Sequence, residues 1–410
     1  MKISIYTLGC KTNQAETESL LRFLENKNVE IVPFPQKADF CILNTCRVTK
    51  RADQKSSLAL NKAIKTASFI IVTGCGVEFQ KERLKEKNKL NKRILFIKDK
   101  KNLIQYLKKE LKTGKGEKIV TRTRAFVKIQ EGCNNFCSYC IVPFVRGIPR
   151  SISPDEIISE IRNLEKMNYK EIVLVGTNIG KYKFGLENLI ELILENTEIE
   201  RIRLSSLNPE DISKNFISLF KKFNKEKIRL CRHLHLSLQS GSDKILKLMG
   251  RNYKKKDFEK LVHNLRKNIE NLLITTDIIV GFPQETEKDF KETLKFLEEI
   301  GFLKIHVFSF SPRPFTKAAR MKNQIPEKTK KERKEAILKL AEKIKKQIYK
   351  ANLNKVFPVL FEEKKDELWQ GYTDNYLPVK VKENINLKNK IFPCFLKRVK
   401  KELEGELFNA

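Results

Sequence analysis

Residues 126–144, FVKIQEGCNNFCSYCIVPF, join an apolar stretch to a loop that holds Cys133, Cys137 and Cys140. The spacing C-x3-C-x2-C places three soft thiolate ligands in one loop, which favours an iron–sulfur centre over three buried structural thiols. A [4Fe–4S] cluster needs four ligands, so three cysteines leave one iron open to a molecule from outside the chain. The sequence therefore predicts a metal centre with a free coordination position directly after a β-strand.

The composition is that of a globular protein with a large excess of positive charge. A chain of 410 residues suits two or three domains, each with its own core. Lys and Arg number 83 against 50 Asp and Glu, a net charge of +33. Such an excess favours a polyanionic partner, RNA or DNA, through phosphate contacts. Compositional drift toward lysine is the alternative.

Neither the apolar runs nor the first residues of the sequence point to a membrane or to export. The longest apolar runs, such as 69–77, are too short to cross a bilayer. The start MKISIYTLGC lacks a basic segment followed by a long apolar core. Nine cysteines, an odd number, fit reduced thiols better than a disulfide framework. We therefore expect a cytoplasmic protein with no membrane partner.

Residues 1–112 alternate short apolar strands with polar helices, which predicts an α/β domain with a parallel sheet. The expected strands are 3–7, 40–44, 69–73 and 94–97, and the expected helices are 16–27, 53–65, 78–90 and 101–112. Cys10, Cys46 and Cys75 each follow one of the first three strands. The carboxyl ends of parallel strands share one edge, where ligands bind. The three cysteines therefore predict a second metal site, with chance placement as the alternative.

A Gly- and Lys-rich linker, 111–124, precedes a second βα series in the predicted domain 119–350. Its expected strands are 126–130, 172–175, 201–205, 233–238, 273–280 and 304–310. Ser151 and Ser153 are candidate caps for a helix over 154–167. Six units predict a partial (β/α)6 barrel rather than a closed eight-unit one, with the loop of Cys133 at its carboxyl mouth.

The last part of the chain predicts a long helix and a small β-barrel. Apolar residues recur at helical spacing over 326–350, and lysines occupy the other face, as a solvated surface or an RNA contact. Residues 353–410 read as short strands of a β-barrel, a fold that often binds nucleic acid. Trp369, Tyr372 and Tyr376 lie among lysines and are candidates for stacking on unpaired bases; a place in the barrel core is the alternative.

Motifs along nearly the whole chain resemble the methylthiotransferase family of radical S-adenosylmethionine (SAM) enzymes. They are TLGCKTNQ (7–14), NTCRVT (44–49), TGC (73–75), EGCNNFCSYCIVPFVRG (131–147), VGTNIGKY (175–182), RLSSLNPED (203–211), HLHLSLQSGSDKILKLMGRNY (233–253) and DIIVGFPQETEKDF (277–290). The branch that modifies N6-threonylcarbamoyladenosine in tRNA is the most similar. The resemblance implies an N-terminal α/β domain, a partial radical SAM barrel and a TRAM-like C-terminal β-domain. One departure is Phe315, where family members commonly have Gly.

The resemblance also implies the cofactors and the reaction. Cys10, Cys46 and Cys75 would bind an auxiliary [4Fe–4S] cluster, and the loop of Cys133, Cys137 and Cys140 a second one that contacts SAM. Radical chemistry is needed because adenine C2 carries only hydrogen, and polar substitution there would have to expel hydride. The implied function is methylthiolation of C2 of N6-threonylcarbamoyladenosine at position 37. The implied partners are a tRNA anticodon stem-loop and an electron donor such as flavodoxin or ferredoxin.

Further site residues are expected near the barrel mouth. Candidates for SAM contacts lie in the cysteine loop or at strand ends: Tyr139, Gly176, Ser205, Ser206, Gln239 and Gly281. Glycine allows close backbone approach, and Ser and Gln can bond ribose or carboxylate; ordinary turn chemistry explains each equally well. Arg146 and Arg150 are candidates for a carboxylate or an RNA phosphate, with a salt bridge as the alternative. His233 and His235 share a strand face and favour a structural role over a metal pair.

Three other functions remain as alternatives. Methylthiolation of N6-isopentenyladenosine in tRNA needs the same chemistry on another N6 substituent. Family members that act on a ribosomal-protein aspartate target an aliphatic carbon. A non-catalytic iron–sulfur RNA-binding sensor would keep the basic surface and the clusters without turnover.

Overall fold

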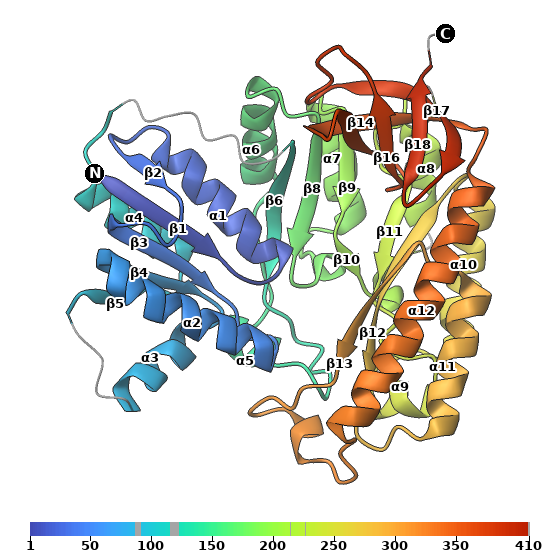
Figure 1. Cartoon of the computed structure of the whole chain (residues 1–410), viewed down its shortest axis with the longest axis horizontal. Helices are drawn as coiled ribbons and strands as arrows, with labels where there is room; N and C mark the ends of the chain where they lie inside the picture. The colour runs from blue at the N-terminus through green and yellow to red at the C-terminus, as the bar shows by residue number, and fades with distance from the viewer. Residues whose placement is uncertain (87–91, 115–122, 214, 226, 409–410) are drawn as a thin grey trace.

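The computed structural model describes residues 1–86, 92–114, 123–213, 215–225 and 227–408, which form three packed parts (Figure 1). The predicted α/β fold class, with parallel sheets and a C-terminal barrel, is confirmed. The exact domain limits stay a prediction, and the limit at 119, like most of the expected linker 111–124, lies outside the described residues. In the described part, no helix combines the length and the apolar character that a membrane span requires.

The N-terminal part is a five-stranded parallel sheet in the order β2-β1-β3-β4-β5. Its elements are β1 (Lys2–Thr7), α1 (Lys11–Leu24), β2 (Glu30–Val32), β3 (Ala38–Thr45), α2 (Lys50–Thr66), β4 (Ala67–Gly74), α3 (Val77–Glu86), β5 (Ile94–Phe96) and α4 (Lys100–Glu110). All four expected strands are present, and the short edge strand β2 was not predicted. Residues 87–90 of one expected helix lie outside the described residues.

Helix α1 begins at Lys11, five positions before the expected start at 16. The prediction was wrong because the first turn is polar and has no apolar periodicity. Cys10 therefore stands at the N-cap of the helix, with an extended backbone and no side-chain cap. The helix places Ala15 against Phe126 and Val173 of the middle part.

The middle part consists of two four-stranded sheets, β7-β6-β8-β9 and β10-β11-β12-β13, which together form an open arc with helices outside (Figure 1). Backbone bonds between Ile202 and Arg229 and between Cys231 and Ile202 join the two sheets. The strands are β6 (Arg124–Glu131), β7 (Arg150–Ser151), β8 (Glu171–Gly176), β9 (Arg201–Leu204), β10 (Ser206–Leu207), β11 (His233–Leu236), β12 (Leu273–Val280) and β13 (Lys304–Ser309). The predicted partial barrel is thus confirmed.

The helices of the middle part are α5 (Val142–Arg146), α6 (Pro154–Lys166), α7 (Leu186–Asn196), α8 (Phe216–Phe223), α9 (Asp243–Met249), α10 (Lys255–Asn268), α11 (Glu287–Ile300) and α12 (Glu327–Ala351). Ser153 caps α6 as predicted, by accepting from the amide of Glu156. Ser151 is not a cap: it belongs to β7, and its hydroxyl accepts from the amide of Lys183.

The C-terminal part is a closed barrel in the order β14-β15-β16-β18-β17. Its strands are β14 (Val356–Lys365), β15 (Leu368–Thr373), β16 (Pro378–Lys382), β17 (Ile391–Val399) and β18 (Leu403–Leu407). This barrel lies at the amino ends of the middle strands (Figure 1), where Arg201 and Arg203 donate to its backbone carbonyls. An ion pair between Arg232 and Asp374, at 2.7 Å, adds to the contact.

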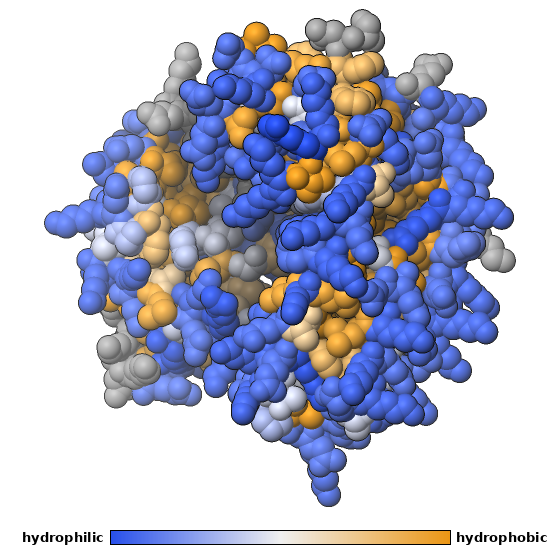
Figure 2. Space-filling view, turned by 45° about the vertical axis from the view of Figure 1, so that its right-hand side comes forward, coloured by the Kyte–Doolittle hydropathy of each residue, from blue (hydrophilic) through white to orange (hydrophobic). Residues whose placement is uncertain are grey.

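The face in Figure 2 is mostly hydrophilic, as the net charge of +33 leads one to expect, and it has a hollow near its middle. Apolar residues appear there as separate patches between charged side chains. The surface is therefore suited to a charged partner, with small apolar areas available for more specific contacts.

Candidate metal centre and active site

The first cysteine trio gathers at the carboxyl edge of the N-terminal sheet. Cys10 follows β1, Cys46 follows β3 and Cys75 follows β4. Gly9 has φ +107°, and a side chain there would come within 2.8 Å of Cβ and 2.9 Å of Sγ of Cys46. Only glycine lets the first loop approach the second this closely. The structure thus brings together three residues that are distant in the sequence.

Asn13 holds the loops of the first trio in place. Its side-chain amide donates to the carbonyl of Leu8, at 2.7 Å, and to that of Thr45, at 3.0 Å. These two carbonyls precede Cys10 and Cys46, so one buried side chain sets the spacing of both loops. The sequence analysis quoted Asn13 within a motif but did not single it out, because an asparagine in a helix gives no signal of its own.

The sulfurs of the first trio influence one another. The Cys46 thiol donates a hydrogen bond to the Cys75 sulfur, and this hydrogen bond, followed by the nearby positive charge of Arg146, lowers the pKa of Cys75 to about 7. The same bond, together with burial, raises the pKa of Cys46. The backbone amide of Arg47 also donates to the Cys75 sulfur at 3.3 Å. Thiolates supported by N–H donors are what an iron–sulfur cluster requires.

The second trio lies in the loop after β6, at the carboxyl mouth of the middle part. The amide of Asn135 donates to the Cys133 sulfur at 3.5 Å, and the Arg251 guanidinium donates to the Cys137 sulfur at 3.5 Å. Burial raises the pKa of Cys140 to about 12, and the charges of the other two cysteines add to the effect. Arg251 was not among the predicted site residues, because it lies 111 positions after Cys140 in the sequence.

Among the described residues, no group of three His, Cys, Asp or Glu side chains converges tightly enough for a single metal ion. This does not count against clusters: a [4Fe–4S] cubane carries each thiolate on a different iron, so its ligands stand further apart than those of one ion. The all-sulfur donor set and the N–H donors aimed at the sulfurs fit such a group.

Arg146 connects the two trios. It closes α5, just after the second trio, and its guanidinium donates to Glu131 at 2.7 Å and to Glu16 of α1 at 3.1 Å. It also donates to Asn13, the residue that organises the first trio. Arg146 is buried, so these bonds occupy a guanidinium that the sequence suggested for a carboxylate or a phosphate. Arg150, by contrast, is exposed and stands 3.9 Å from Glu131.

The candidate SAM residues lie at different places around the mouth. Gly176 ends β8 where a side chain would come within 2.9 Å of the carbonyl of Gln130. Ser205 is buried and its hydroxyl has no partner among the described residues, whereas Ser206 is exposed. Tyr139 packs against a small apolar cluster, and burial raises its pKa well above the ordinary value.

The last two candidate SAM residues, Gln239 and Gly281, have evident local roles. Gln239 has φ +72° and bridges to β12 through its backbone. Gly281 also has a positive φ, +70°, and a side chain there would come within 2.3 Å of Lys330. Close packing against α12 therefore accounts for this glycine.

Asn178 is a further polar residue at the mouth that was quoted in a motif and not singled out. Its side chain is 3% exposed, and neither amide atom has a well-formed hydrogen bond in the described structure. It lies beside Cys133, where burial raises the pKa of the thiol and Asn178 acts in the opposite direction. The polar atoms of Asn178, beside Cys133, and the unpartnered hydroxyl of Ser205, directly after β9, can form hydrogen bonds with a bound SAM.

The three aromatic candidates of the C-terminal barrel differ in exposure. Trp369 is 7% exposed and belongs to the barrel core, so it does not present a face to bases. Tyr376 has φ +78° and reaches into the middle part, where its ring lies 4.6 Å from the ring of His233. Tyr372 stacks on Tyr376 at 5.0 Å. Arg124 of β6 lies over both rings, so the two tyrosines lie where the C-terminal barrel contacts the middle part.

The two histidines of β11, for which a structural role was expected, share one hydrogen-bond partner. Nε2 of His233 and Nδ1 of His235 both lie within hydrogen-bond distance of the Thr275 hydroxyl, at 3.0 and 2.9 Å.

An exposed aromatic group beside the second trio was missed. Phe136, Phe144 and Phe315 are 56%, 48% and 66% exposed. The ring centroids of Phe136 and Phe144 lie 6.2 Å apart, and those of Phe144 and Phe315 lie 5.9 Å apart. Phe136 and Phe315 both have a positive φ, 46° and 69°, which phenylalanine adopts only at a cost. The positive φ explains why glycine suits position 315.

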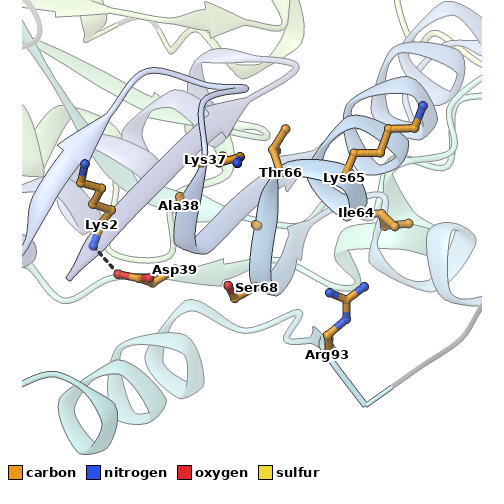
Figure 3. Close-up of a pocket in the computed structure, with 10 residues that line it drawn as sticks. Lys2, Lys37, Ala38, Asp39, Ile64, Lys65, Thr66, Ser68 and Arg93 are labelled. Carbon is orange, nitrogen blue, oxygen red and sulfur yellow. Dashed lines mark hydrogen bonds between the residues drawn. The ribbon is translucent and has the colours of Figure 1, made fainter.

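A surface pocket in the N-terminal part is not part of this site. It is lined by residues at the amino ends of the N-terminal strands, among them Lys2, Asp39 and Arg93 (Figure 3). The backbone amide of Lys2 donates to Asp39 there, at 2.7 Å. The cysteines lie at the opposite, carboxyl, edge of the same sheet.

Replacing Gly132 by alanine should remove iron from the second trio. Gly132 has φ +81°, and a side chain there would come within 2.1 Å of the carbonyl of Ile148. The loop must shift, and Cys133 with it. Iron and sulfide analysis of anaerobically purified protein measures the loss. Gly301→Ala is the matched control: its φ is +67°, nothing lies within 4 Å of the added atom, and it follows α11, away from the cysteine loop. It should retain its iron, and equal iron in both variants would contradict the prediction.

Comparisons with known proteins agree with this geometry. Residues 127–297 match the model of the Radical SAM superfamily, and residues 2–95 match that of the Uncharacterized protein family UPF0004. The chain is 34% identical to the threonylcarbamoyladenosine tRNA methylthiotransferase MtaB of Bacillus subtilis, over 95% of this chain and 92% of the relative. It is 36% identical to the tRNA-2-methylthio-N(6)-dimethylallyladenosine synthase of Thermodesulfovibrio yellowstonii, over 100% and 99%.

Among solved structures, the chain is similar to the radical SAM methyltransferase TsrM of Kitasatospora setae, which was solved with cobalamin and a [4Fe–4S] cluster. The TM-score is 0.58 at 12% identity, covering 78% of this chain and 77% of that one, which supports the fold alone. The family rests on the identities to methylthiotransferases over nearly the full length of both chains. This chain belongs to the methylthiotransferase family of radical SAM enzymes, which transfer sulfur-containing groups.

Proposed function

We propose that this protein methylthiolates C2 of N6-threonylcarbamoyladenosine at position 37 of tRNA, in the cytoplasm. In this proposal Cys10, Cys46 and Cys75 hold one [4Fe–4S] cluster. The loop of Cys133 and its two neighbours holds the other. The observation that carries the proposal is the junction at Arg146, which contacts the loop of each trio through Asn13, Glu16 and Glu131.

The names of the relatives favour one tRNA nucleoside as the substrate. Four of the relatives with identities of 34–37% are named threonylcarbamoyladenosine tRNA methylthiotransferases. Relatives with similar identities are named for dimethylallyladenosine, so the isopentenyl substrate is the alternative that an experiment must separate.

The protein's own residues have definite tasks in this proposal. SAM held at the second trio would supply the one-electron chemistry that removes the hydrogen atom from adenine C2. Ser205 and Asn178 offer free polar atoms to bind and orient it. Arg146 fixes the two loops relative to each other, so that the adenine can meet both centres. An electron donor such as a flavodoxin or ferredoxin must deliver the electrons from outside the chain.

The exposed rings of Phe136, Phe144 and Phe315 support an unpaired RNA loop as the partner. Bases of a loop stack on aromatic rings, while the basic surface holds the phosphates. An anticodon stem-loop carries its modified base among such unpaired neighbours. The rings lie beside the second trio, where a substrate base must arrive.

The test is nucleoside analysis of tRNA by mass spectrometry, with and without the gene. The proposal expects the loss of 2-methylthio-N6-threonylcarbamoyladenosine alone. Loss of the methylthio-isopentenyl nucleoside instead would assign the other substrate. Unchanged tRNA would reject a role in tRNA and direct the search to a protein substrate or to a sensor without turnover.

Replacing Phe144 by alanine should weaken binding of an anticodon stem-loop RNA. Each base–aromatic stack contributes about 1–3 kcal/mol, which corresponds to a five-fold or greater rise in Kd. Phe315→Gly should weaken binding in the same way without lowering stability, because glycine accepts φ +69°. Phe408→Ala, an exposed ring in the C-terminal part, is the control. Unchanged Kd in the first two variants would rule out stacking on this group.

A further inference from the structure

The loop of Cys137 packs against the end of α9. The backbone amide and the hydroxyl of Ser138 donate to the carbonyls of the last two residues of α9, at 2.9 and 2.8 Å. Gly250, directly after α9, has φ +73°, and a side chain there would come within 3.9 Å of Cα of Cys137. The chain that follows α9 is therefore held against the second trio, and its next residue, Arg251, starts beside Cys137.

Arg251 is a buried cation that bonds a cysteine of the second trio. The residue is 9% exposed, and its Nη1 donates to the Cys137 sulfur at 3.5 Å. Its Nη2 donates to the side-chain oxygen of Asn208 at 2.9 Å, and its Nε donates to the Tyr253 hydroxyl at 3.3 Å. Glu210 lies 3.5 Å from Nη2, the nitrogen that does not bond the sulfur. These partners fix the plane of the guanidinium and aim Nη1 at the sulfur.

The donors to the other cysteine sulfurs are uncharged. The Cys133 sulfur accepts from the backbone amide of Asn135, and the Cys75 sulfur accepts from the backbone amide of Arg47. Arg146 carries a charge near the first trio, but its bonds go to two carboxylates and an amide oxygen. Within the described residues, Arg251 is thus the one charged side chain that donates a hydrogen bond to a cysteine sulfur of either trio.

A positive charge at this sulfur bears on the reduction of the cluster that the second trio would hold. In that step one electron passes from the external donor to the cluster, so the negative charge beside Arg251 grows by one unit. A buried cation stabilises added negative charge strongly, because little water is present to screen the interaction. Hydrogen bonds to the sulfurs and the net charge of a cluster are among the factors that set its reduction potential.

We propose that Arg251 is a positioning residue that acts through Cys137 and raises the reduction potential of the second cluster, so that an external donor can reduce it. The inference rests on the proposed function, in which this cluster binds SAM. The competing explanation is a purely structural role, in which Arg251 only joins the chain after α9 to the segment of Asn208. Such a role would change the stability or the iron content, but not the potential of an intact cluster.

The experiment is a reductive titration of the iron-loaded protein, followed by electron paramagnetic resonance. The signal of the second cluster is recognised by its change when SAM is added. Arg251→Met removes the charge and the hydrogen bond, and should make reduction of this cluster about ten-fold less favourable, a fall of about 59 mV for a one-electron couple. Arg251→Lys retains the charge and should show a smaller fall. The potential of the first cluster should stay unchanged in both variants.

The matched control is Arg229→Met. Arg229 donates to the carbonyls of Leu194, Thr197 and Ile199, at 2.7, 2.7 and 3.2 Å, so it also ties segments of the middle part together. It precedes β11, at the amino ends of the strands and away from the second trio. This variant should keep the potentials of both clusters.

The electron donor gives a second readout. With reduced flavodoxin, Arg251→Met should form 5′-deoxyadenosine from SAM about ten-fold more slowly than the wild type, because less of its second cluster is reduced at equilibrium. Titanium(III) citrate is a stronger reductant and should restore most of the rate. A structural defect would lower the rate with both reductants.

The outcomes separate this inference from the function on which it rests. An Arg251→Met protein with full iron and an unchanged potential overturns the inference. If this variant loses iron, Arg251→Gln decides, because it removes the charge and keeps an N–H donor; full iron with an unchanged potential again overturns the inference. Loss of iron from all three variants, lysine included, establishes the structural role and also overturns it. A wild type whose second trio holds no cluster, or which forms no 5′-deoxyadenosine from SAM, overturns the proposed function instead.

Discussion

Alanine at Cys46 or at Cys137 should halve the iron content of the anaerobically purified protein, from about eight atoms per chain to about four. In the proposed function each trio supplies all the protein ligands of one cluster, and two thiolates do not retain a cubane. The two variants should differ in turnover. Cys137→Ala should form no 5′-deoxyadenosine from SAM. Cys46→Ala should still form it but transfer no methylthio group to RNA.

The control for this experiment is Cys394→Ala. Cys394 is a buried core residue of the C-terminal barrel and is remote from both trios. It should keep about eight irons and both activities. If Cys46→Ala and Cys394→Ala held equal iron, the first trio would not be a cluster site. Both iron analysis and the Mössbauer spectrum of the protein report the result.

Replacing Arg203 by methionine should lower the free energy of unfolding by about 3–5 kcal/mol. Arg203 is 1% exposed and bonds Glu171, which is fully buried, at 2.7 and 3.2 Å. It also donates to the carbonyls of Thr373 and Asp374, so it joins the C-terminal barrel to the middle strands. Without Arg203, the buried carboxylate of Glu171 keeps its charge, and only Arg124 and Arg201 remain to stabilise it. Urea denaturation, followed by the fluorescence of the single tryptophan, measures the change.

The matched control is Arg398→Met, which breaks an exposed pair with Glu404 and should cost about 1 kcal/mol or less. The pH dependence gives a second check. Burial alone would raise the pKa of Glu171, but Arg203, Arg124 and Arg201 hold it below the ordinary value. The stabilisation is therefore present above the ordinary pKa of a glutamate, and it is lost as the pH falls through the lowered one. An Arg203→Met protein as stable as the Arg398→Met protein would contradict this account.

Much of the fold could be predicted because its elements have strong local signals. Strands β1, β3, β4 and the six main strands of the middle part are apolar runs between polar segments, and the structure contains all of them. The start of α1 could not be predicted, because the polar residues after Cys10 have no apolar periodicity, and the contacts of Asn13 and Glu16 involve other segments of the chain. The edge strand β2 is too short to show a pattern.

The sequence by itself determined which residues are the candidate cluster ligands, through the spacing of Cys133, Cys137 and Cys140 and the position of three more cysteines after strands. Only the tertiary structure decided how they are connected. Arg146 proved to be a buried link between the two loops rather than an open anion site, and Trp369 a core residue. Ligand type is a property of local sequence, whereas burial and charge pairing depend on segments brought together from distant positions.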